Sequence, residues 1–440
     1  MLKDAQGFAL SGATSAAAAE LESGLAELLC YRGNPVARAK NALAEAPDFA
    51  LAHAVMAWLN LLGTEPGALP AARKYHANLL RTARTEREKG HAAAIGHLVE
   101  GRWHEAGRVL EDVTIAYPRD SLALLAGHQI DFFTGHSRML RDRIARALPY
   151  WNEDMPDYHA TLGMHAFGLE ETGDYARAEA TGRRGVELEP RNGWAQHAVA
   201  HVLEMQNRTE EGIAWMRGSD AWAGDSFFKV HNWWHLALYH LELGDFPTVL
   251  SLFDGEIDGN SSGLAIELVD ASALLWRLLL RGVNTGDRWA ALADKWAPLV
   301  ATSTYAFNDV HAAMAFVGAG RRDAVEAVLA AQREAMQRPG DNAGFAADVG
   351  LAATQAILAF GDGDYRRAIG LLRPVRSIAH HFGGSHAQRD VLDLTLIEAA
   401  LRTGDAPLAQ ALADERFDRR HDSPLSRLFK RRAEDLAAAA

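Results

Sequence analysis

Apolar residues recur every three or four positions along almost the whole chain, and short breaks of glycine, asparagine, aspartate and proline separate the apolar segments. This spacing puts the apolar side chains on one face of an α-helix, whereas the alternation typical of strands is almost absent. Alanine and leucine dominate the segments between the breaks. The pattern predicts an all-α protein built from many short helices.

Several breaks share one motif: a glycine, a polar residue, an aromatic or apolar residue, and a small residue three positions later. The copies are GRWHEA (101–106), GDYARA (173–178), GDFPTV (244–249), GDYRRA (363–368) and GDAPLA (404–409). Together they resemble the turn and second-helix half of a tetratricopeptide repeat. In that repeat the glycine takes the left-handed conformation that ends helix A, the aromatic packs back on helix A, and the small residue lets helix B approach closely.

Two further breaks fit the motif less well. One has Asn207 at the turn and Gly212 at the small position, and the other opens at Gly320. The spacing agrees with a repeat of about 34 residues that carries inserts. Because a single helical hairpin cannot cover its own apolar face, the hairpins must stack. We therefore predict a curved tetratricopeptide-repeat-like α-solenoid of stacked helical hairpins, forming one domain over 1–440 with an irregular insertion at 254–283.

Charge and cysteine content narrow the partners and the compartment. The net charge of −12 argues against a nucleic-acid partner, which would need clustered Lys and Arg. The basic stretch 416–432 is interleaved with acidic residues, so we expect a solvated helix face. The single cysteine, Cys30, fits a core position and a reducing cytoplasm. No stretch long enough to span a bilayer is recognised, so we expect no membrane partner and a cytoplasmic location.

The segment QHAVAHVLEM places three polar side chains on one helical stripe. His197, His201 and Glu204 are spaced by four and then three residues, which keeps them on one face. With Asn207 at the turn, they fall at the helix-A positions that line the concave groove of such repeats. In the next repeat His231 and Trp234 take groove positions, whereas His235 is expected to point toward the packing with helix B.

Two further segments carry candidate residues. Asn308, Asp309 and His311 lie at the start of another predicted helix, in FNDVHAAMAF. Asp270 lies inside the apolar run LVDASALLW, where a buried charge needs a partner. Trp234 can wall an apolar pocket beside the histidines.

The histidine cluster allows three kinds of chemistry. A His-x-x-x-His pair on a helix is a good base for zinc or iron, so the metal candidates are His197, His201, Glu204 and His231, and a divalent metal is a candidate cofactor. The zincin mechanism is not supported, because Ala198 stands where it needs a glutamate. An acid–base site needs no metal. Alternatively, the groups hydrogen-bond to one another and rigidify the array, with Asp270 or Asp309 holding a histidine tautomer.

Blocks along the whole chain resemble the tetratricopeptide-repeat protein 38 family. They include DAQGFALSGATSAA, AQHAVAHVLEM, HNWWHLALYHLELGDF, ELVDASALLWRL and FNDVHAAMA, in this order. The resemblance implies a closed or strongly curved helical array, without a firmly established activity. The residues that match the family pattern are His128, His197, His201, Glu204, His231, Asn232, His235, Asp270, Asn308, Asp309 and His311.

The leading hypothesis is an enclosed, histidine-rich pocket that binds a small molecule or an extended peptide segment. His197, His201, Glu204 and His231 would bind the ligand, and 308–311 would close the far side. The alternative is a hydrolase or lyase in which Glu204 or His201 is the base and Asp309 orients His311. A metal-free protein with an open groove would instead favour a scaffold for partner proteins.

Overall fold

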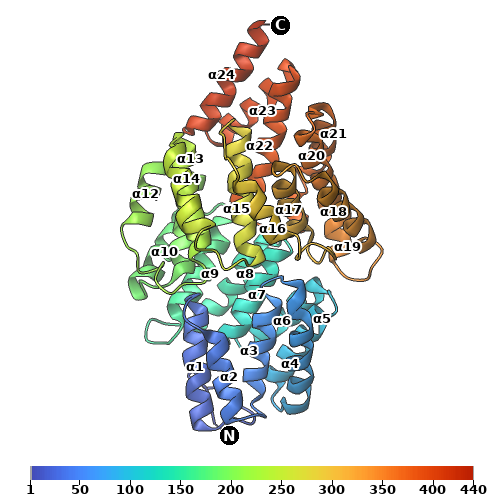
Figure 1. The fold of residues 1–440 in the computed structure, drawn as a ribbon. Helices are drawn as coiled ribbons and strands as arrows, with labels where there is room; N and C mark the ends of the chain where they lie inside the picture. The colour runs from blue at the N-terminus through green and yellow to red at the C-terminus, as the bar shows by residue number, and fades with distance from the viewer. Residues whose placement is uncertain (1, 440) are drawn as a thin grey trace. The chain divides into compact units, whose positions relative to one another are not determined.

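The computed structural model describes residues 2–439, and in that range the chain is helical with no β-strand (Figure 1). Short turns join successive helices, and neighbours in sequence pack against each other as antiparallel hairpins. The prediction of an all-α fold of stacked helical hairpins is confirmed. The fold is tetratricopeptide-repeat-like.

Two compact units divide the chain. Unit 1 comprises Met1–Val202, Ser219–Lys229 and Pro339–Asp341, and unit 2 comprises Leu203–Gly218, Val230–Arg338 and Asn342–Ala440. The boundary between Val202 and Leu203 falls inside the helix Gly193–Met205, and the boundary between Lys229 and Val230 falls inside the helix Lys229–Leu243. The prediction that the chain forms a single repeat domain stays a prediction.

Unit 1 contains the hairpins α1–α2, α3–α4, α5–α6 and α9–α10, with α7 and α8 between the last two. The helices are α1 (Ser15–Leu29), α2 (Pro35–Glu45), α3 (Ala50–Leu61), α4 (Leu69–Thr82), α5 (Glu86–Val99), α6 (Trp103–Ala116), α7 (Ser121–Phe133), α8 (Ser137–Ala147), α9 (Tyr158–Glu170) and α10 (Tyr175–Leu188). Helix α11 (Gly193–Met205) begins in unit 1 and ends in unit 2.

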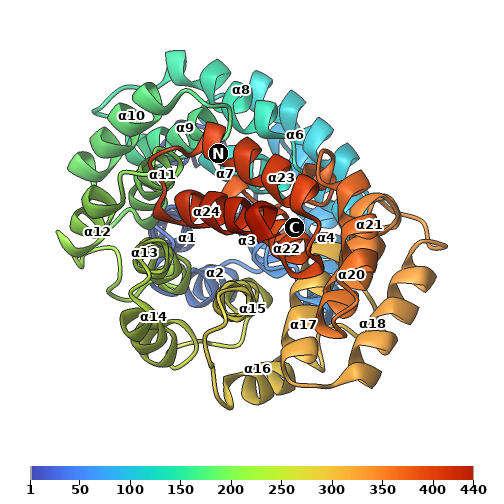
Figure 2. The ribbon, with the colours of Figure 1, turned by 90° about the horizontal axis from the view of Figure 1, so that it is seen from above.

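Unit 2 continues the helical hairpins, and Figure 2 shows α17, α18, α20 and α21 side by side. The helices are α12 (Thr209–Arg217), α13 (Lys229–Leu243), α14 (Phe246–Leu252), α15 (Ala265–Leu280), α16 (Arg288–Trp296), α17 (Ala306–Gly318), α18 (Arg322–Ala335), α19 (Asn342–Phe345), α20 (Leu351–Gly361), α21 (Tyr365–Val375), α22 (His386–Thr403), α23 (Ala406–Arg419) and α24 (Pro424–Ala439).

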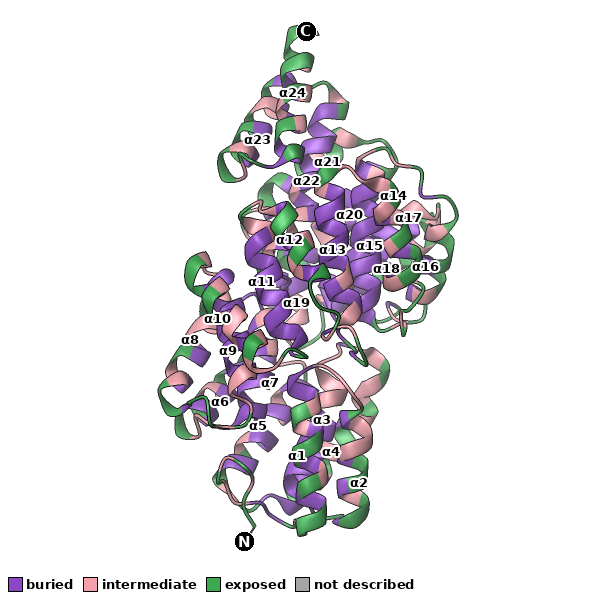
Figure 3. Cartoon of the chain, turned by 90° about the vertical axis from the view of Figure 1, so that its left-hand side faces the viewer, coloured by how far each residue is buried: buried purple, intermediate pink, exposed green. Residues whose placement is uncertain are grey.

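The two helices of a hairpin differ in how much of their surface is buried. First helices such as α9, α13 and α15 are buried on nearly every face, whereas second helices such as α10, α12 and α16 bury one stripe (Figure 3). A helix that is apolar all round belongs in a core, and an amphipathic helix belongs at the surface. Polar residues on the first helices are therefore the ones that need an explanation.

The turn positions behave as the motif predicts. The glycines of the five motif copies have φ between 75° and 82°, in the left-handed region. Asn207 takes the same conformation with φ 56°, and Gly320 with φ 69°. Asparagine is the side chain that tolerates this region best after glycine. The aromatic of the 363–368 copy packs back as expected, because the ring of Tyr365 lies 5.1 Å from that of Phe360 on α20.

Gly212 shows why the repeat needs a small residue on helix B. A Cβ atom at Gly212 would lie 2.2 Å from the ring of Tyr239 on α13. The corresponding residue of the other copies, for example Ala178 or Ala368, is completely buried. The close approach of α12 to α13 thus depends on glycine at position 212, which has no side chain.

The irregular segment begins with a π-helix at Phe253–Ile257, followed by a polar loop and by α15, whose residues are almost all buried. Another segment differs from expectation. Asn342–Gly361 forms 20 residues of helix, long and apolar enough by length and composition to cross a membrane, although the sequence indicated no such stretch. The fold buries 61% of its most apolar window, as it would a core helix.

Most of the basic stretch 416–432 is solvated as the sequence indicated, since Arg419, Arg427 and Arg431 are exposed, but Arg416 is an exception. Arg416 is 2% exposed and holds both carboxylate oxygens of Asp390, at 2.7 and 3.0 Å. Arg432 pairs with the buried Glu398 at 3.1 Å. The carboxylates that meet these two arginines therefore lie on α22, outside the interleaved stretch. Cys30, by contrast, is a buried core residue as predicted, and burial raises the pKa of its thiol to about 12.

We expect Gly212→Ala to lower the free energy of unfolding by about 1–3 kcal/mol, because the new methyl group overlaps the Tyr239 ring. Gly370→Ala is the matched control, since Gly370 also lies inside a second helix and its Cβ would meet nothing within 4 Å. The control should gain up to about 1 kcal/mol from helix propensity. Urea denaturation of both variants measures the difference, and equal midpoints would contradict the packing argument.

Candidate functional site

Helix α11 begins on a fixed cap. Asn192 Oδ1 accepts the Ala195 N–H at 3.0 Å, while its Nδ2 donates to the carbonyl of His159 at 3.0 Å. The cap therefore ties the start of α11 to α9. Residues 192–203 are all buried. The helix thus holds its two histidines in a defined place away from solvent.

His197 and His201 lie one helical turn apart, and their ring centroids are 4.4 Å apart. They are 1% and 0% exposed. The sequence prediction that they share one face is confirmed. Rings of Phe167, Trp194 and Phe228 surround them, with centroids 4.8–5.3 Å from that of His197. This aromatic shell excludes water and strengthens electrostatic interactions at the imidazoles.

Glu170, at the end of α9, is the carboxylate nearest to His201. Its Oε2 lies 3.4 Å from His201 Nδ1, and both side chains are 0% exposed. Glu170, Glu171 and His201 each offer a metal-ligating atom, and these atoms lie within 4.8 Å of one another. The sequence prediction missed both glutamates. The available signal was an acidic pair at the end of an otherwise apolar helix, directly before the Gly173 turn.

His231, on α13, is held by a buried carboxylate of α15. Its Nδ1 lies 2.8 Å from Asp270 Oδ2, and Asp270 is 0% exposed. An ionised carboxylate only accepts, so a neutral His231 would carry its proton on Nδ1 and keep a lone pair on Nε2. The expectation that Asp270 needs a partner is confirmed by this contact, and the tautomer stays a prediction. Trp234 stacks on His231 with centroids 5.3 Å apart, and its role as a pocket wall stays a prediction.

His235 differs from expectation. Instead of turning toward helix B, it faces α11, and its Nδ1 lies 3.0 Å from Glu204 Oε2. His231 and His235 are one turn apart, with centroids 4.9 Å from each other. Residues four apart share a helix face, so the two imidazoles stay together. Glu204 is therefore the partner of His235 Nδ1, and Arg420 lies 3.7 Å from its other oxygen.

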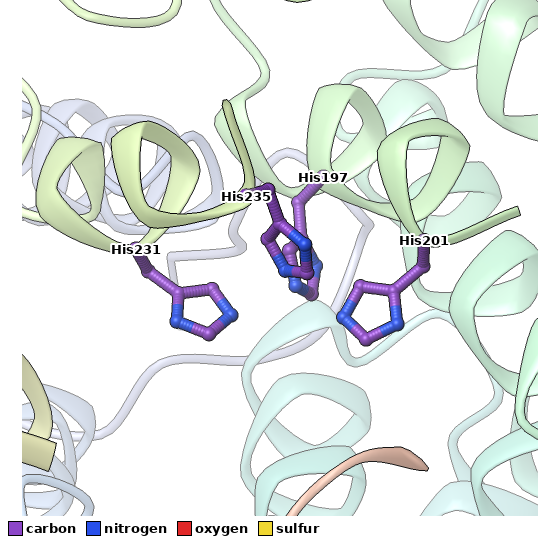
Figure 4. A group of neighbouring side chains, drawn as sticks. All are labelled: His197, His201, His231 and His235. Atoms are coloured by element: carbon purple, nitrogen blue, oxygen red, sulfur yellow. The ribbon is translucent and has the colours of Figure 1, made fainter. Parts of the chain in front are cut away.

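Figure 4 shows the four histidines of α11 and α13, of which His197 and His201 belong to unit 1 and His231 and His235 to unit 2. His231 and His235 are named here the α13 histidine pair, and each offers one ring nitrogen within 4.8 Å of the other. Three of the four have a carboxylate oxygen at 2.8–3.4 Å from Nδ1. Glu204, which the sequence suggested as a ligand beside His197 and His201, instead backs His235.

Three further predicted residues, His128, Asn232 and Asn308, are buried or half-buried. His128 is 0% exposed, and its ring centroid lies 5.7 Å from that of Trp194, which places it behind the aromatic shell. Burial lowers its pKa to about 3, so it is neutral. Asn232 is completely buried on α13, and Asn308 is half-buried on α17.

Asp309 does not orient His311. Two residues apart on α17, they point to different sides of the helix. Asp309 accepts the Ser303 hydroxyl at 2.5 Å, and His311 Nδ1 donates to the Phe307 carbonyl at 2.8 Å. Burial raises the pKa of Asp309 to about 7 and lowers that of His311 to about 4. The prediction that Asp309 orients His311 is therefore wrong, because each side chain has a different partner.

Comparisons with known proteins concern the fold alone. No family model matches the chain. The chain is similar to the human IFIT1 dimer with m7Gppp-AAAA, with 15% identity and a TM-score of 0.41, covering 84% of this chain and 87% of that one. It is also similar to the APC/C hetero-tetramer Cut9-Hcn1, with 13% identity, a TM-score of 0.43 and coverage of 95% and 76%. For the P58(IPK) TPR domain the identity is 14% and the TM-score 0.22, with coverage of 89% and 99%.

Asp309 should make stability depend on pH. Its carboxyl is protonated in the folded chain up to a pKa of about 7 but ionises near 3.8 when exposed. Between these values the folded state binds the extra proton, so rising pH favours unfolding. Asp309→Asn removes this titration. We expect its free energy of unfolding, relative to the wild type, to rise by up to about 1.4 kcal/mol per pH unit from pH 5 to 7.

Urea denaturation at several pH values measures this difference. The prediction fails if the difference between the variant and the wild type stays constant over that range. Ser303→Ala removes the hydroxyl that donates to the carboxylate. It should extend the window in which the folded chain keeps the proton to higher pH.

Proposed function

We propose that the α13 histidine pair, His231 and His235, binds one divalent transition-metal ion, which anchors a small-molecule or peptide ligand. The observation that carries the proposal is the carboxylate behind each imidazole: Asp270 lies 2.8 Å from Nδ1 of His231, and Glu204 lies 3.0 Å from Nδ1 of His235. Metal-binding histidines usually donate the other ring N–H to such a carboxylate. The carboxylate fixes the tautomer and makes the ligating nitrogen more basic.

The donor set indicates the kind of metal. Imidazole nitrogens suit zinc, iron, copper and nickel rather than magnesium or calcium, which prefer oxygen. Two nitrogens on one ion at about 2.1 Å can lie at most about 4.2 Å apart. The nitrogens of His231 and His235 lie within 4.8 Å of each other, so the pair needs only a small contraction to bind one ion.

The coordination number of the ion decides what the site does. A structural ion is closed by four protein ligands, whereas an ion held by two imidazoles keeps positions for a ligand of the protein. Trp234, which stacks on His231, favours a ligand with an apolar part.

A second candidate function is a metal-dependent hydrolase or lyase, and the acidic pair beside His201 favours it. Glu170 and Glu171 place carboxylate oxygens within 4.8 Å of the His201 ligand atom. An ion held by His201 would supply Lewis-acid activation for a hydrolysis. Glu170 would accept the proton of the attacking water and return it to the leaving group. His201 would act as a ligand rather than as the base.

The third candidate, a scaffold for partner proteins, rests on the helical repeat fold, which commonly presents binding surfaces. A protein that binds no metal would favour it. Membership of the tetratricopeptide-repeat protein 38 family rests on the ordered sequence blocks, and cytoplasmic location on the single cysteine. Exclusion of nucleic acid rests on the net charge of −12. The IFIT1 structure carries m7Gppp-AAAA, so a capped RNA is the probe that tests this exclusion.

Metal content tests the proposal. The full chain, stripped with chelator and reloaded in turn with zinc, iron, cobalt and nickel, should retain close to one ion per chain after desalting. His231→Ala combined with His235→Ala should retain almost none, because the ion loses both imidazoles. The control is His381→Ala, which removes a surface histidine that also pairs with a carboxylate, Asp348. Elemental analysis measures the ion, and a wild-type chain that stays folded but metal-free would overturn the proposal.

The backing carboxylates should tune affinity without being ligands. Asp270→Asn should weaken metal binding by about 10–100-fold, because His231 loses the acceptor that fixes its tautomer. Asp245→Asn is the control, since Asp245 backs His240, which does not belong to the α13 histidine pair. Competition with a chelating indicator gives both dissociation constants. Equal affinities would mean that the pair of Asp270 and His231 has a structural role only.

A further inference from the structure

A separate cavity lies wholly within unit 2, next to α13. Its volume is about 40 Å³. Its charged lining residues are Glu204, Glu242, Arg277, Asp390, Arg416 and Arg420, and leucines of α13, α22 and α24 form an apolar part of the wall. None of the four histidines lines it. It is therefore a site of its own.

The three carboxylates of the lining already have partners. Asp390 binds Arg416 through both oxygens, at 2.7 and 3.0 Å. Glu242 accepts the Leu425 N–H at 3.0 Å and the hydroxyl of Ser423. Glu204 is engaged by the His235 Nδ1 at 3.0 Å and by Arg420 at 3.7 Å.

Arg277 is different from the other two arginines. It is 4% exposed, and its guanidinium donates to two backbone carbonyls, those of Ala273 at 3.1 Å and Ala387 at 2.6 Å. Its Cζ lies 5.4 Å from the centre of the Trp234 ring. Among residues 2–439, no carboxylate lies within ion-pair distance of Arg277. Burial lowers the pKa of its guanidinium to about 10.

A buried cation whose direct partners are all neutral is expensive, because desolvation removes its hydration without replacing it by an opposite charge. The cost falls if an anion occupies the cavity beside it. A guanidinium has five N–H donors in a flat fork, which matches the two oxygens of a carboxylate. Arg277 uses only part of this capacity on the two carbonyls.

The volume limits the size of the anion. One water molecule needs about 10–15 Å³ on this measure, so the cavity takes roughly three such groups. Formate and acetate fit this size, whereas sulfate and phosphate are larger. The leucines in the wall favour an organic acid over a halide, since they can cover an alkyl group.

We propose that this cavity binds a small carboxylate anion of the size of formate or acetate, held by the guanidinium of Arg277. Asp390 and Glu204 act on Arg277 through space, but neither forms an ion pair with its guanidinium, so the anion supplies a negative charge in direct contact. Its oxygens lie toward Arg277, and its carbon side lies toward the leucines. The cavity shares Glu204 with the metal site proposed above, but no histidine lines it.

Isothermal titration of the full chain with sodium acetate, at constant ionic strength, tests the site. Saturable binding with one site per chain is expected, and formate should compete for it. Arg277→Met should bind acetate about 10–100-fold more weakly, since a charged hydrogen bond is lost. The variant should stay folded, because a buried unpaired charge becomes an apolar side chain of similar length. Thermal unfolding without added anion checks this.

Arg281→Met is the matched control, since Arg281 follows Arg277 by one turn but does not line the cavity. It should bind acetate like the wild type. Chloride or sulfate binding as tightly as acetate would overturn the carboxylate assignment, and so would unchanged acetate binding in Arg277→Met. A tripeptide with a free terminal carboxylate separates a chain end from a free acid. The volume of about 40 Å³ predicts that acetate binds and the tripeptide does not, and equal binding would overturn the small-acid assignment.

Discussion

Buried carboxylates paired with buried imidazoles are the constraint on which the candidate site depends. Asp270 is completely buried, and an ionised carboxylate at such a place is costly unless it is paired. Its partner is His231 rather than an arginine or a lysine. A neutral imidazole meets the carboxylate with one N–H and keeps a second nitrogen available. Pairs of this kind stabilise the helices and leave the lone pair of the second ring nitrogen available to a metal ion. An ion pair with arginine would leave no such lone pair.

The repeat architecture could be predicted because its turns are local. The glycine motif fixes a backbone conformation within a few residues, and even Asn207 could be recognised at a turn because its side chain tolerates the left-handed region. The stripe of His197 and His201 could be predicted for the same reason, since helical spacing alone determines it. Asp270 could be identified as needing a partner because it interrupts an apolar run. Its partner, His231, follows only from the packing of α13 against α15.

The rest of the site depends on contacts between helices, which spacing does not contain. Glu170 was missed because nothing in its own helix shows that it faces His201. Spacing alone makes Glu204 a groove residue, but its oxygen meets His235 on the next first helix. The couple of Asp309 and His311 was wrong because proximity in sequence does not imply contact, and residues two apart on a helix diverge. Arg277 gave no signal at all, since a lone arginine in an apolar helix looks the same whether or not a carboxylate meets it.

The central claim is that His231 and His235 can act together on one ion. X-ray absorption spectroscopy of the cobalt- or zinc-loaded full chain tests it most directly, because the spectrum reports the type and number of the ligating atoms. The account predicts imidazole nitrogens at about 2.0–2.1 Å, with multiple-scattering features of two histidines. A spectrum with oxygen ligands alone would contradict it.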